Sequence, residues 1–267
     1  MPYADNDGVS LYYEADGPAD AETVVFVEGL GYARWMWRWQ RERLVEDYRV
    51  VVWDNRGTGD SDAPTGPYSV SGMAGDLDAV LADAAVEEAH VVGASMGGMI
   101  AQQYALDYDR AESLALLCTS PGGDDAVPTP PETRERMFDV PEGADERETI
   151  RYRMAPAMTD EFVAEHDALV ADVVDWRLAS DADDAAREAQ AAAVAAFDPG
   201  DGLHEIDVPA LVAHGTADRV LPVENAELLA ERLPDAELEL FEGGPHLFFI
   251  ERADDLNDRL LAFLDDA

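Results

Sequence analysis

The chain has 267 residues, of which 58 are Asp or Glu and 18 are basic, and its formal net charge is −40. Every basic residue is Arg. This balance excludes nucleic-acid binding through a broad basic face and disfavours docking on an anionic membrane, because both require clustered cations. The hydrophobic fraction of 47% excludes a disordered chain, and the lone cysteine, Cys118, excludes an intrachain disulfide. Because the N-terminus shows no signal-peptide pattern, we expect a cytoplasmic protein, either monomeric or homo-oligomeric.

Short β-branched runs alternate with helical segments along most of the chain. The run at 9–14 predicts an antiparallel edge strand. Further runs without polar alternation predict strands covered on both faces, at 23–28, 49–53, 89–93, 113–118 and 210–214, and a further strand is predicted at 237–241. Helices are predicted between them at about 32–44, 71–84, 97–106 and 223–233. This alternation indicates βαβ units and a mostly parallel central sheet flanked by helices.

One long stretch interrupts this alternation. Residues 121–203 open with the linker PGGDDAVPTPP and continue as helix-prone sequence without a credible strand. We therefore predict a core made of residues 1–120 and 204–267, with a helical cap or lid inserted at 121–203. The insertion is expected to lie above the sheet rather than to fold as an independent domain.

The segment Gly93–Gly97 (GASMG) follows a predicted strand and begins a predicted helix. A nucleophilic serine needs such a strained strand-to-helix turn, and flanking glycines let the strand and the helix approach each other. Two further residues follow later strands: Asp218 in the HGTAD segment and His246 in the GGPH segment. The chain order Ser95, Asp218, His246 is the order of an α/β-hydrolase triad, in which His246 takes the serine proton and Asp218 orients the imidazole.

With these residues in place, the chain resembles the α/β-hydrolase family over nearly its whole length. The turn Asp54–Ser61 (DNRGTGDS) matches the turn that such enzymes carry after the preceding strand, and we interpret it as architectural. The resemblance implies the α/β-hydrolase fold with a helical lid. It implies neither a cofactor nor a metal, and the four histidines other than His246 show no metal-ligand spacing.

The resemblance also implies an oxyanion hole built from two backbone N–H groups. Met96, directly after the nucleophile, should supply one donor, and Leu30 should supply the other. Members of the family usually have His-Gly at the second loop, whereas this chain has Glu28 before Gly29. Because a carboxylate facing the oxyanion would oppose the chemistry, we expect Glu28 to point away, with Arg56 as its candidate partner.

Aromatic and apolar side chains near the site are candidates for binding the substrate. The candidates are Tyr32, Trp35, Phe138, Met158 and Trp176, and plain packing is the alternative for each. The apolar residues of the insertion suggest a largely hydrophobic cavity.

The motifs disfavour some classes of reaction but do not select a single one. Ser rather than Asp at position 95 disfavours epoxide hydrolases and haloalkane dehalogenases. The main hypothesis is hydrolysis of a small-molecule carboxylic ester or lactone through an acyl-Ser95 intermediate. The alternatives are an enol-lactonase of aromatic catabolism, a haloperoxidase or perhydrolase, a C–C bond hydrolase, and a ligand-binding protein that retains the triad.

The net charge indicates the medium in which the protein works. An excess of acidic residues without Lys resembles proteins of halophilic archaea that accumulate salt. Molar salt shortens the Debye length to about 3 Å and removes most of the self-repulsion of such a chain. We therefore expect an enzyme of a halophilic archaeon, adapted to high salt.

Overall fold

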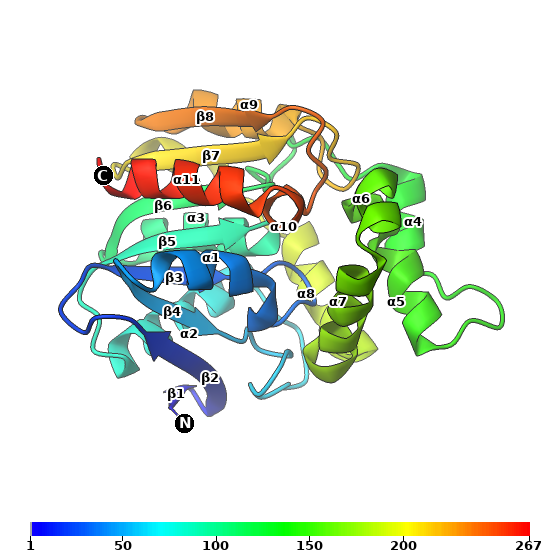
Figure 1. Cartoon of the computed structure of the whole chain (residues 1–267). Coiled ribbons are helices and arrows are strands. Elements are labelled where there is room, and N and C mark those ends of the chain that lie inside the picture. Colours follow the sequence, from blue (N-terminus) through cyan, green and yellow to red (C-terminus); the bar gives the residue numbers. More distant parts are fainter. Residues whose placement is uncertain (1) are drawn as a thin grey trace.

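The computed structural model describes residues 2–267, and its centre is an eight-stranded sheet in the order β1-β2-β4-β3-β5-β6-β7-β8 (Figure 1). Strands β1 and β2 pair antiparallel, as do β2 and β4, and all the other neighbouring strands of the sheet are parallel. Their bounds are β1 Tyr3–Asn6, β2 Val9–Asp16, β3 Thr23–Val27, β4 Arg49–Trp53, β5 Ala89–Ala94, β6 Ala111–Leu117, β7 Ala210–Gly215 and β8 Ala236–Phe241. The predicted fold class is confirmed, with one additional short edge strand, β1.

Helices cover both faces of the sheet (Figure 1). On one face α2 (Val70–Asp83), α3 (Met96–Asp107) and α9 (Glu224–Arg232) bury their apolar sides in one core. On the other face lie α1 (Arg38–Leu44) and α11 (Ala253–Leu264), which pack around Trp37 and Phe249. The strands in the middle of the sheet are fully buried, as expected for a parallel sheet covered on both faces.

The helix predicted at 32–44 is broken. A 3-10 turn, η1 (Arg34–Trp37), precedes α1 because the Asp54 carboxylate accepts a hydrogen bond from the Arg34 backbone N–H, and the Arg34 guanidinium pairs with the same carboxylate. Two C-terminal helices, α10 (Phe248–Glu251) and α11, were not predicted.

Between β6 and β7 the described chain forms helices and turns without a strand. The helices are α4 Pro131–Phe138, α5 Glu146–Met154, α6 Asp160–Glu165, α7 Asp167–Ser180 and α8 Asp184–Ala195, joined by the 3-10 turns η2 Ala155–Ala157 and, before β7, η3 Gly200–Glu205. This α4–α8 segment lies beyond the carboxyl ends of the parallel strands (Figure 1). Within residues 2–267, no helix combines the length and the apolar character needed to cross a bilayer.

Candidate active site

Ser95 lies on the sharp turn between β5 and α3. Its φ of 55° and ψ of −116° place a non-glycine residue in strained backbone. The turn is possible because glycines flank it: a Cβ on Gly97 would lie 2.0 Å from the Val27 carbonyl oxygen, and one on Gly93 would lie 2.3 Å from the Gly97 carbonyl oxygen. The two glycines let β5, β3 and α3 meet closely enough to hold the serine at the end of the sheet.

Asp218 and His246 form a hydrogen-bonded pair beyond the ends of β7 and β8, at the same edge of the sheet as Ser95. His246 Nδ1 lies 2.7 Å from Asp218 Oδ2, and the other carboxylate oxygen accepts from the backbone N–H groups of Val220 and Leu221 at 2.7 and 3.0 Å. Burial favours the neutral acid, but the neighbouring His246 and His214 outweigh burial and hold the pKa of Asp218 below its usual value. Asp218 is therefore a fixed anion that orients the imidazole with Nδ1–H donating and Nε2 free to accept.

His214 belongs to the same network, although sequence reasoning assigned it no role. Its Nε2 lies 2.9 Å from the Leu221 carbonyl oxygen and 3.1 Å from Asp218 Oδ2. Because both partners are acceptors, Nε2 carries a proton and donates to them. Its position four residues before Asp218, at the end of β7, was the signal that could have revealed it.

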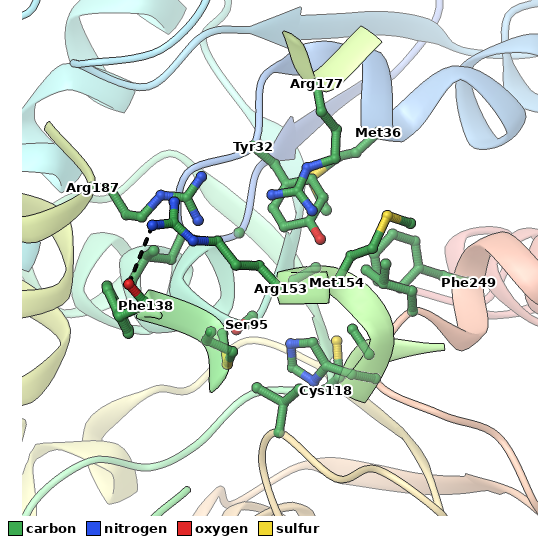
Figure 2. A pocket seen from close by; sticks show the side chains of 18 residues that line it. Tyr32, Met36, Ser95, Cys118, Phe138, Arg153, Met154, Arg177, Arg187 and Phe249 are labelled. Carbon is green, nitrogen blue, oxygen red and sulfur yellow. Dashed lines mark hydrogen bonds between the residues drawn. The ribbon is translucent and has the colours of Figure 1, made fainter. Parts of the chain in front are cut away.

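Ser95 and His246 line one cavity, shown in Figure 2. In the described chain no hydrogen bond joins their side chains. Such contacts are often loose without substrate and tighten when it binds.

The two predicted oxyanion donors are free. Neither the Leu30 nor the Met96 backbone N–H has an acceptor among the described residues, and Met96 begins α3, whose first amides have no partner within the helix. The two loops touch: a Cβ on Gly29 would lie 3.5 Å from Ser95 Cβ. Both donors therefore border the serine.

The expectation that Glu28 pairs with Arg56 is wrong. Arg56 binds Asp76 instead, at 2.5 and 2.6 Å. Glu28 is fully buried, and neither of its carboxyl oxygens has a partner among the described residues. Burial, and next the charge of Asp54, raise the pKa of Glu28 well above its usual value, which favours the neutral acid. A neutral Glu28 places no charge behind the oxyanion loop.

The candidate substrate-binding residues separate into two groups. Tyr32 and Phe138 line the Ser95 cavity, whereas Trp35, Met158 and Trp176 do not, and substrate binding by these residues stays a prediction. Trp35 donates its indole N–H to Asp181 at 3.0 Å and packs on Trp176, so both rings join the α4–α8 segment to η1. Met158 is buried in the core.

The cavity contains charged residues that sequence reasoning did not single out. Arg153 from α5, Arg177 from α7 and Arg187 from α8 reach its wall (Figure 2). The expected hydrophobic cavity is thus apolar on some walls and cationic on another. No group of three or more His, Cys, Asp or Glu side chains suited to a metal occurs within residues 2–267.

The comparisons with known proteins agree with this architecture. A family model described as alpha/beta hydrolase fold matches residues 22–253, and the chain belongs to that family. A protein of Azorhizobium caulinodans, provisionally named carbamate hydrolase RutD, is 31% identical over 98% of both chains. A provisionally named non-heme chloroperoxidase of Synechocystis is 29% identical over 99% of this chain and all of its own. The crystal structure of the enol-lactonase from Burkholderia xenovorans superposes with a TM-score of 0.83 at 28% identity, covering 99% of this chain and all of the enol-lactonase.

Proposed function

We propose that the protein is a serine hydrolase that cleaves a carboxylic ester or a lactone through an acyl-Ser95 intermediate. The observation that carries the proposal is the strained Ser95 turn beside a histidine that a buried, hydrogen-bonded Asp218 holds in one tautomer. This arrangement meets the requirements of an activated nucleophile with an oriented base.

Each step of the proposed reaction is assigned to a residue. Ser95 Oγ attacks the carbonyl carbon while His246 Nε2 takes its proton, and the carbonyl oxygen becomes an anion facing the Leu30 and Met96 amides. The C–O bond to the leaving group then breaks, and the imidazolium returns the proton to the alcohol. Water, deprotonated by His246, attacks the acyl-Ser95 ester and releases the acid and the free serine.

We further propose that residues 121–203 act as a lid on the core formed by 1–120 and 204–267. Gln190 of α8 supports this role, because its side chain accepts from the Gly31 N–H at 2.7 Å and donates to the Arg56 carbonyl at 2.9 Å. The lid thus contacts the oxyanion loop directly. A small-molecule substrate, a cytoplasmic location and a halophilic archaeal source complete the proposal, the last supported by the charge of −40.

The triad also supports other reactions. The similarity to a chloroperoxidase and to an enol-lactonase keeps peroxide chemistry and enol-lactone hydrolysis as alternatives, and the similarity to a protein named as a carbamate hydrolase adds carbamates. C–C bond hydrolysis uses the same groups. A ligand-binding protein with an idle triad is the alternative outside catalysis.

The test is steady-state turnover of p-nitrophenyl acetate in molar KCl by the wild type and by Ser95→Ala. We expect the variant to lose on the order of 10⁶-fold in kcat. Equal turnover by both proteins would overturn the role of Ser95. A panel of esters, lactones, carbamates and C–C substrates at high salt then separates the reactions, and a lack of turnover on all of them favours the binding protein.

A further inference from the structure

The active-site cavity has the opposite charge to the rest of the molecule. The chain carries 58 acidic and 18 basic residues, yet three of its arginines line this one cavity. They come from three different helices of the lid, so no single charged run explains their convergence. Figure 2 shows their guanidinium groups entering the cavity above Ser95.

Arg187 lacks a counter-ion. Its guanidinium makes no hydrogen bond or ion pair with any described residue, and its Nε is buried. It lies against the backbone of Gly31, where a Cβ would come within 3.4 Å of its Cζ. Burial, and next the charge of Arg177, lower the pKa of Arg187, but a guanidinium stays protonated in proteins. Arg187 is half-buried, and a partly desolvated cation without a paired anion is costly.

The other two arginines already have partners that hold them in place. Arg177 Nε donates to Asp181 at 2.6 Å, and its guanidinium lies 4.3 Å from the Tyr32 ring centroid. Arg153 donates to the Phe138 carbonyl at 3.2 Å and to the exposed Asp184 carboxylate at 3.2 Å. Asp181 is itself shared with the Trp35 indole. The local carboxylates therefore do not offset three cations, and the excess is at Arg187.

The space around Ser95 has two unequal parts. The arginine-lined cavity is small, with a volume of about 50 Å³. A second cavity, which shares Ser95 and Leu30 with the first, has a volume of about 340 Å³. Its wall includes the apolar residues Met99, Val194 and Phe197 and also Arg134. Such a site suits a substrate with one small anionic end and one larger apolar end.

We propose that the arginine-lined cavity binds a carboxylate of the substrate, so that the enzyme hydrolyses esters or lactones that carry a carboxylate close to the scissile carbonyl. Arg187 is the residue that this carboxylate pairs with, and Arg153 and Arg177 add to the positive potential. Guanidinium groups bind carboxylates through paired N–H donors. This substrate class rests on the proposed serine hydrolase function.

The first measurement compares kcat/KM for substrates that differ only in charge, at one fixed KCl concentration. Mono-4-nitrophenyl succinate and its neutral isostere 4-nitrophenyl 4-methylpentanoate place the charge on the acyl side. The acetate esters of 4-hydroxybenzoate and of 4-hydroxybenzamide place it on the leaving group. We expect the anionic member of at least one pair to be preferred about 10- to 100-fold, the range for hydrogen bonds to charged groups. The pair that shows the preference tells which side of the ester the cavity holds.

The second measurement repeats the comparison with Arg187→Met, with Arg187→Lys and with Arg147→Met as the matched control. Arg147 is a lid arginine that pairs with Asp175 at the surface, away from the cavity. Arg187→Met should abolish the anionic preference, Arg187→Lys should retain part of it, and the control should match the wild type. Wild-type selectivity near unity for both pairs, or an unchanged preference in Arg187→Met, would overturn the proposal.

Titration calorimetry with succinate separates this proposal from the hydrolase function, because it does not need turnover. Succinate should bind the wild type and Ser95→Ala but not Arg187→Met. Succinate binding without turnover of any ester would support the carboxylate site and contradict the hydrolase function. Ester turnover without succinate binding or charge selectivity would support the hydrolase function and contradict the carboxylate site. Arg187→Met should also melt at a higher temperature than the anion-free wild type, because it removes a half-buried cation that has no ion-pair partner among the described residues; circular dichroism confirms its fold.

Discussion

The core and the α4–α8 lid contribute different kinds of residue to the same cavity. The core supplies groups fixed by the backbone at strand ends: Ser95 after β5 and His246 after β8 line the cavity, and Asp218 after β7 binds His246 from behind. The lid supplies long cationic side chains from three helices. Under the proposed function, the core performs the reaction and the lid selects which substrates reach it. Changes in the core should affect every substrate equally, whereas changes among the lid arginines should discriminate between substrates.

The largest effect expected in the core, after loss of the nucleophile, is that of Asp218→Asn. The amide can no longer fix the His246 tautomer or stabilise its cation, so kcat should fall about 10⁴-fold. The loss should be the same for anionic and neutral esters, measured with the substrate pairs above. Asp175→Asn, an exposed lid carboxylate, is the control and should retain wild-type rates. A loss that depends on substrate charge would break the division between core and lid.

Gln190 should give a smaller effect, because it joins the two regions without touching the reacting atoms. Gln190→Met removes the hydrogen bonds to Gly31 and Arg56 and leaves the buried Gly31 N–H unpaired, which costs about 1–3 kcal/mol of unfolding free energy. If it also positions the oxyanion loop, kcat should fall about tenfold for anionic and neutral esters alike, with KM nearly unchanged.

The control is Gln103→Met, at an exposed glutamine of α3 that hydrogen bonds to Asp107. It should keep both its stability and its kcat. A Gln190→Met protein with a lower melting temperature but wild-type kcat would make Gln190 a purely structural contact.

The core was readable from the sequence because its signals are local. Strand, turn and glycine patterns around Gly93–Gly97 follow from steric demands within a few residues, and parallel strands bring their carboxyl ends to one edge. The order of Ser95, Asp218 and His246 then restricts which residues meet. Even His214 carried a readable signal, its spacing from Asp218.

The helical character of residues 121–203 was predicted, but the side chains that this segment contributes to the cavity were not, because its contacts depend on how helices far apart in the chain converge. Arg153, Arg177 and Arg187 resemble ordinary helix-surface charges in sequence, and only packing turns them inward. Trp35 and Trp176 were candidates for binding the substrate, but they lie outside the Ser95 cavity and pack against each other with tilted rings, 5.7 Å between centroids. Glu28 was likewise expected to pair with a cation, but it is buried without a partner among the described residues.

Glu28 is fully buried and Arg187 is half-buried, neither has a partner among the described residues, and chemistry allows the two side chains different outcomes. A carboxyl group can take up a proton and become neutral, whereas a guanidinium cannot lose its charge. The core thus accommodates Glu28 through its raised pKa, while the lid leaves Arg187 in need of an anion from outside. Glu28→Gln, which mimics the neutral acid, tests this difference and has the smallest expected effect of these substitutions.

In the unfolded chain Glu28 ionises near its ordinary pKa of 4.5, whereas the folded protein holds the proton to higher pH. The favourable contribution of the protonated Glu28 carboxyl group to the free energy of unfolding is complete below the pKa of the unfolded chain. It is lost as pH rises through the pKa of the folded protein, at up to about 1.4 kcal/mol per pH unit. Glu28→Gln should therefore match the wild type near pH 4 and become progressively more stable than it at higher pH, by urea unfolding in molar KCl. Glu46→Gln, an exposed position on the surface, should follow the wild type throughout. Parallel curves for the wild type and Glu28→Gln would mean that the buried carboxyl group ionises in the folded protein, and the contrast with Arg187 would then disappear.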